Sequence, residues 1–194
     1  GKNDPWIYDE CRAASSTQKG ERKLHLWARN ADNDPVGHSG YTLEDADGSL
    51  TSFHISDGDG DPFNVSPARV YTGNDDYIAI TGPADQRPAN YSMETFVIDK
   101  AQYDAAFKFG MDALNNGIDY NLLNMGGLNC SGFGVCGAWS AGVGQGYLPT
   151  SPANLREAIY WNGNRISYPN RGNIIFGGDP TSNQILQGPR FQKQ

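Results

Sequence analysis

Alternating apolar and polar residues predict a sheet in the first half of the chain. Residues 23–28 have the two-residue period of a half-buried strand, and residues 37–43 and 50–55 are the second and third strand candidates. Along the first of them, Leu24, Leu26 and Ala28 share one face, whereas His25 and Trp27 share the other. Residues 76–81, 92–98 and 173–176 are further strand candidates.

An Asp-Gly dipeptide at residues 47–48 separates the second and third of these strands. This dipeptide is typical of hairpin turns, because both of its residues tolerate the backbone angles that such turns require. The hairpin therefore brings together the strands that carry His38 and His54.

Three later segments have helical spacing and helix start signals. Asp99 is the N-cap of the first, Asn129 precedes the second, and Ser151-Pro152 opens the third, which continues to Tyr160. The apolar residues of the first are expected in the core: Tyr103, Ala106, Phe107, Met111 and Leu114. The pattern predicts an α+β fold in which an antiparallel sheet packs against the helix that begins at Cys130.

The length of 194 residues suits one domain, and no internal repeat suggests a second. We expect a core of about residues 23–160, an N-terminal arm of residues 1–22 and a C-terminal extension of residues 161–194. The net charge is −7 and no Lys/Arg cluster is present, which argues against nucleic-acid and membrane partners. The first residues show no signal peptide, and no apolar run is long enough for a transmembrane helix.

The three cysteines, Cys11, Cys130 and Cys136, leave at least one free thiol, because their number is odd. A bridge between Cys11 and Cys136 remains open. No C-x-x-C pair is present and the histidines are scattered, so we expect no zinc site and no cofactor. Asp57, Asp59 and Asp61 resemble the start of a calcium loop, but Ala68 occupies the position where an EF-hand has Glu. A solvated Gly/Asp loop is the alternative.

Cys130 lies at a helix start, directly after the N-cap Asn129. The positive end of the helix dipole favours the thiolate, which is the nucleophilic form. Hydrolysis by a cysteine further needs an imidazole, a group that orients it and N–H donors for the oxyanion. The alternative is a buried core cysteine.

The residues around Cys130 resemble the cysteine motif of NlpC/P60 peptidases. The shared features are Tyr120, the pair Gly126-Gly127 and the run from Asn129 to Phe133, with Asn129 where the family has Asp. In the usual order of that family the histidine follows the cysteine, whereas all three histidines here precede Cys130.

The order of histidine, second polar residue and cysteine is instead similar to the circularly permuted branch, which includes lecithin–retinol acyltransferase-like proteins. The resemblance covers about residues 36–160 and implies a papain-like fold. It makes Cys130 the nucleophile, His38 the base and His54 the orienting residue, although Ser52 or another polar residue is an alternative for the last role. Tyr120 and Ser131 are the expected substrate-binding residues, and His25 is expected to be structural.

The layout also resembles amidase effectors that bacteria inject into competitors by type VI secretion. The resemblance implies a cysteine hydrolase that cleaves amide bonds in peptidoglycan peptides. It would be a secreted antibacterial effector that acts in the periplasm of the target cell. An immunity protein and a secretion component would be its partners. Two alternatives are an acyltransferase or lipid/thioester hydrolase of the same fold, and a non-enzymatic calcium- or glycan-binding module.

Overall fold

The computed structural model describes residues 20–31, 34–82, 91–162 and 165–167, and it has the predicted α+β fold. Its strands are β1 (Arg22–Ala31), β2 (Asp34–Glu44), β3 (Leu50–Ser56), β4 (Ser66–Pro67), β5 (Arg69–Tyr71), β6 (Tyr91–Ile98), β7 (Asp119–Tyr120) and β8 (Arg165–Ser167). Its helices are α2 (Asp75–Thr81), α3 (Lys100–Asn116), α4 (Cys130–Ser140) and α5 (Pro152–Trp161).

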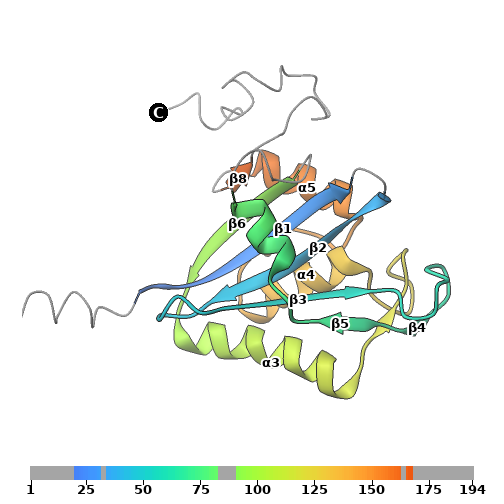
Figure 1. The fold of residues 1–194 in the computed structure, drawn as a ribbon, viewed down its shortest axis with the longest axis horizontal. Helices are drawn as coiled ribbons and strands as arrows, with labels where there is room; N and C mark the ends of the chain where they lie inside the picture. Colours follow the sequence, from blue (N-terminus) through green and yellow to red (C-terminus); the bar gives the residue numbers. More distant parts are fainter. Residues whose placement is uncertain (1–19, 32–33, 83–90, 163–164, 168–194) are drawn as a thin grey trace, which may run out of the picture.

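One antiparallel sheet with the strand order β5-β3-β2-β1-β6-β8 forms the centre of the molecule. β2 and β3 form the predicted hairpin, in which Tyr41 pairs with Phe53 and Glu44 with Leu50. Figure 1 shows α2 in front of this sheet and α4 behind it. A second, two-stranded sheet pairs β4 with β7, so it joins the loop after β3 to the segment that precedes α4.

The two faces of the sheet bury two separate apolar clusters. Strand residues that include Leu24, Leu26 and Tyr41 pack with helices α3, α4 and α5 in the main core. On the other face, Trp27 packs in a smaller cluster with Tyr77 and Ile80 of α2 and with two residues of β6. The predicted division of β1 into two faces is therefore confirmed.

Helix α4 lies directly on strand β2, because glycines remove the side chains that would separate them. A Cβ atom added to Gly134 would lie 3.3 Å from backbone atoms of Gly40. A Cβ atom added to Gly137 would lie 2.1 Å from Cε1 of Tyr41. The two glycines therefore allow the helix to pack in direct contact with Gly40 and Tyr41 of β2.

Two predictions about the elements were wrong. Residues 76–81 belong to helix α2 rather than to a strand, since Tyr77 and Ile80, three residues apart, are buried together while Ile78 is exposed. Leu114 was expected in the core but is exposed on α3. Residues 173–176, most of the predicted arm and most of the predicted extension lie outside the described residues.

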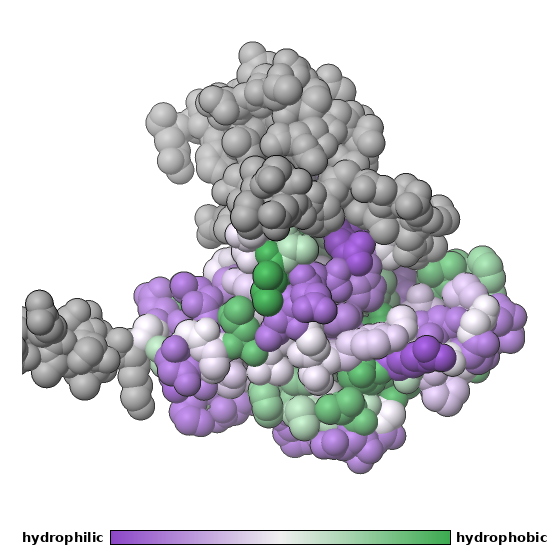
Figure 2. All heavy atoms as spheres, in the orientation of Figure 1, coloured by the Kyte–Doolittle hydropathy of each residue, from purple (hydrophilic) through white to green (hydrophobic). Residues whose placement is uncertain are grey.

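No helix in the described ranges is both long and apolar enough to cross a membrane. On the face shown in Figure 2, apolar residues form separate patches among hydrophilic ones. Several of the exposed apolar side chains come from the loops joined by the small β4–β7 sheet, namely Phe63, Val65, Leu123 and Met125.

Candidate functional site

His38 and His54 form a hydrogen-bonded pair on neighbouring strands, as the hairpin predicted. Nε2 of His38 lies 2.8 Å from Nδ1 of His54, and the two rings meet edge to face. Gly40 gives the side chain of His54 the room that it needs, because a Cβ atom on residue 40 would lie only 2.7 Å from the Cβ atom of His54. The pair therefore depends on both strands and on this glycine.

The carbonyl of Gly73 determines which nitrogen of His54 carries the proton. Nε2 of His54 lies 3.3 Å from that oxygen, which can only accept a hydrogen bond. The proton is therefore on Nε2, and the lone pair of Nδ1 points to His38, whose Nε2–H donates to it. Burial lowers the pKa of His54, although Asp76 opposes this, so the ring is neutral near pH 7.

Asp76 of α2 completes a group of three side chains. Its Oδ1 accepts a hydrogen bond from Nε of Arg29 at 2.6 Å, and its Oδ2 lies 4.0 Å from Nε2 of His38. The sequence analysis missed Asp76 because it assigned this segment to a strand. Two consecutive acidic residues after Asn74 are a first-turn helix signal that would have placed it correctly.

Aromatic rings hold the two imidazoles in place. The ring of Trp27 lies 5.7 Å from that of His38 and 5.8 Å from that of His54. Tyr71 of β5 stacks on the ring of His54, with the two ring centroids 5.2 Å apart. The side chains of His38 and Asp76 are 17% and 20% exposed, so solvent reaches the group from their side.

Cys130 is the first residue of α4, and Asn129 caps the helix as predicted. The side-chain oxygen of Asn129 accepts from the backbone N–H of Gly132 at 2.8 Å. Its amide nitrogen also donates to the backbone carbonyls of Leu122 and Thr150. Cys130 is only 3% exposed, and burial raises the pKa of its thiol despite hydrogen bonds from Ser39. The sulfur is therefore a buried, neutral thiol here.

The sheet separates Cys130 from the two histidines. Ser39 donates a hydrogen bond to Ser131 of α4 at 3.0 Å, so the Ser39 side chain points toward the face that α4 covers. Adjacent strand residues point to opposite faces, and His38 accordingly contacts Trp27 and Asp76 on the α2 face. The structure brings His38 and His54 together but does not assemble the predicted pair of Cys130 and His38.

The expected substrate-binding residues also lie on the α4 side. Tyr120 is buried in the main core, and Ser131 is fully buried against Ser39. Their binding roles stay predictions. Cys136 is a partly buried free thiol, and Cys11 lies outside the described residues.

The Asp-rich loop at residues 57–61 uses its carboxylates to form its own turns. Asp57 accepts from the N–H of Asp59, Asp59 from that of Asp61, and Asp61 from that of Phe63. These contacts are Asx-turns on the surface, which agrees with a solvated loop. Calcium binding there stays untested.

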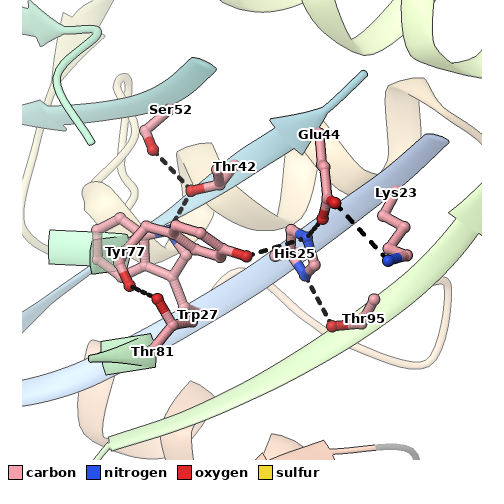
Figure 3. A network of polar contacts seen from close by, with 9 residues as sticks. All are labelled: Lys23, His25, Trp27, Thr42, Glu44, Ser52, Tyr77, Thr81 and Thr95. Atoms are coloured by element: carbon pink, nitrogen blue, oxygen red, sulfur yellow. Dashed lines mark hydrogen bonds and ion pairs between the residues drawn. The ribbon is translucent and has the colours of Figure 1, made fainter. Parts of the chain in front are cut away.

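His25 lies on the α2 face in a different polar network (Figure 3). It is 4% exposed, and its two nitrogens lie 2.7 Å from Oγ1 of Thr95 and 2.9 Å from Oε2 of Glu44. The hydroxyl of Tyr77 lies 3.3 Å from the second nitrogen. Every partner joins β1 to a neighbouring element, which supports the predicted structural role.

We expect the free energy of unfolding to fall as the pH drops below about 6.5. Burial lowers the pKa of His25, and the bond to Glu44 only partly opposes this. Between the lowered folded pKa and the unfolded value of 6.5, the unfolded chain binds more protons, so acid favours unfolding. His54 contributes with the same sign. Each group adds at most about 1.4 kcal/mol per pH unit.

Urea denaturation between about pH 7.5 and pH 5 measures this effect. The variant His25→Gln should show a shallower loss of stability over the same range. An unchanged pH dependence in the variant would show that His25 does not contribute.

Comparisons of the chain with protein-family models, with curated proteins and with solved structures found no match.

Proposed function

We propose that the chain is a cysteine hydrolase of amide bonds with a permuted, papain-like NlpC/P60 fold, here in a closed state. The observation that supports this is the hydrogen bond between His38 and His54. The sequence resemblance assigns these two residues the roles of base and orienting partner. A hydrogen-bonded pair of this kind is what a base and its orienting group require.

In this proposal Cys130 attacks the carbonyl carbon of the amide and forms a thioester. His38 accepts the thiol proton and transfers it to the leaving amine, and water then hydrolyses the thioester. The backbone N–H of Cys130 donates to the oxyanion. Catalysis requires a rearrangement that uncovers the sulfur and brings it to the same side of β2 as the ring of His38.

The proposed substrate is the peptide stem of peptidoglycan. The chain would be a secreted effector acting in the periplasm of a target bacterium and would be neutralised there by an immunity protein. These proposals rest on the sequence resemblance alone.

The burial of Cys130 favours a second candidate, a non-enzymatic binding module. In that case Cys130 is a core thiol, which is a frequent role of a buried cysteine. The exposed Gly/Asp loop at residues 57–61 would then be part of a glycan- or calcium-binding surface.

Incubation with purified muropeptides, followed by mass spectrometry of the products, tests the first candidate. We expect cleavage by the wild-type chain and a loss of about 10³-fold or more in Cys130→Ser and His38→Ala. Cys136→Ser is the matched control and should retain the wild-type rate, because Cys136 lies in the interior of α4 rather than at its start.

Thiol labelling separates the two candidates. The labelling uses a variant in which Cys11 and Cys136 are replaced by serine, so that Cys130 is the remaining cysteine. If the chain is a hydrolase, Cys130 should be alkylated in the folded protein, and added muropeptides should change the rate of alkylation. Intact muropeptides, together with a Cys130 that is labelled only on unfolding, would contradict the hydrolase and favour the binding module.

A further inference from the structure

We propose that His38, His54 and Asp76 form a binding site for a divalent first-row transition metal such as Zn²⁺. Their ligand atoms all lie within 4.8 Å of one another. Two imidazoles and a carboxylate are ligands that zinc prefers. The inference goes beyond the proposed hydrolase, because it needs no contribution from Cys130.

The distances in this group are close to those of a zinc site. With bonds of about 2.0–2.1 Å and tetrahedral angles, two ligand atoms are roughly 3.3 Å apart. Nε2 of His38 and Nδ1 of His54 are 2.8 Å apart, and Oδ2 of Asp76 is 4.0 Å from the former. To bind the metal, the two nitrogens would separate by about half an ångström and the carboxylate oxygen would approach by somewhat less than 1 Å.

The surrounding contacts already orient the ligand atoms. The hydrogen bond from His54 to the carbonyl of Gly73 leaves the Nδ1 lone pair directed into the group. Arg29 holds Oδ1 of Asp76, which leaves Oδ2 on the side of His38. Such outer contacts fix the tautomer and the direction of ligands in metal sites.

Among the described residues, three side chains would supply ligands, and the partial exposure of His38 and Asp76 would let water take a fourth position. This arrangement is typical of zinc sites with an exchangeable ligand rather than of closed structural sites. A metal bound to Nε2 of His38 would move the proton of this neutral ring to Nδ1, so in the proposed hydrolase the imidazole would have no lone pair left to accept the thiol proton.

Titration of the metal-free full chain with Zn²⁺ by calorimetry tests the site, and Co²⁺ provides a visible spectrum that reports coordination. We expect binding of one Zn²⁺ per chain and Co²⁺ bands of tetrahedral type. Asp76→Asn should weaken Zn²⁺ binding at least tenfold. The matched control is Asp75→Asn, because Asp75 is the exposed neighbour of Asp76 on α2 and lies outside the group.

The histidine variants make the result specific. His54→Gln should also weaken Zn²⁺ binding. If circular dichroism shows that His54→Gln is unfolded, His38→Gln is tested in its place. Cys130→Ser should bind Zn²⁺ like the wild type. The test of the metal site therefore stays valid even if the hydrolase proposal is wrong. Absence of Zn²⁺ binding, or binding that all these substitutions leave unchanged, would overturn the inference.

Discussion

Replacing Gly137 by valine is expected to lower the free energy of unfolding by about 3 kcal/mol. A Cβ atom at this position would lie 2.1 Å from Cε1 of Tyr41, which is far inside van der Waals contact. The ring of Tyr41 is fully buried, and its hydroxyl donates to the carbonyl of Ala106, so it has little freedom to move aside. Helix propensity favours valine over glycine by only a few tenths of a kcal/mol, which does not offset the overlap.

Urea denaturation followed by circular dichroism measures this loss. Gly73→Ala is the matched control: a Cβ atom there has no neighbour within 4 Å, so its effect should stay within about 0.5 kcal/mol. Wild-type stability of Gly137→Val would mean that α4 does not pack on Tyr41 as described.

The second large effect is expected from Asn129→Asp, which should destabilise the fold by about 3 kcal/mol. Asp is as good an N-cap as Asn, and it is the residue that the NlpC/P60 motif has at this position. The amide nitrogen of Asn129, however, donates to the carbonyls of Leu122 and Thr150 in a buried setting. A carboxylate cannot donate, so it would leave both carbonyls unpaired and would place its negative charge beside them.

The change Asp99→Asn at the start of α3 is the reciprocal control. Asp99 is exposed, and its side chain only accepts a hydrogen bond, from the N–H of Gln102, so asparagine should serve nearly as well there. If Asn129→Asp costs no more than this control in urea denaturation, the two donated hydrogen bonds do not contribute to stability.

Strand patterns and helix start signals predicted most of the longer elements. The segments of β1, β2, β3 and β6 were predicted as strands, and helices α3 and α4 begin at Lys100 and Cys130, directly after the caps Asp99 and Asn129. The strand prediction for the segment of α2 was wrong because a short apolar run with several β-branched residues fits a strand as well as a helix. Its burial against Trp27 is a tertiary effect that the local sequence does not contain.

The candidate site was predicted only in part, for a similar reason. The two-residue period of a strand puts His38 and Ser39 on opposite faces of β2, but it cannot say which face α4 will cover. The covered face is seen only in the tertiary packing, where Gly134 and Gly137 allow the helix to approach Gly40 and Tyr41. Asp76 joined the histidines only through the position of α2 across the sheet, 22 residues beyond His54 in the chain.

The strand order also limits how this sheet can associate with other chains. At one end it finishes with β5, which has only three residues, and two of them, Arg69 and Tyr71, have exposed side chains. A short outer strand with an exposed cation offers few backbone groups for pairing and repels a second copy of itself. His54 lies one strand further in, on β3, and His38 two strands further in, on β2, so a second sheet is discouraged from adding strands beside the imidazole pair.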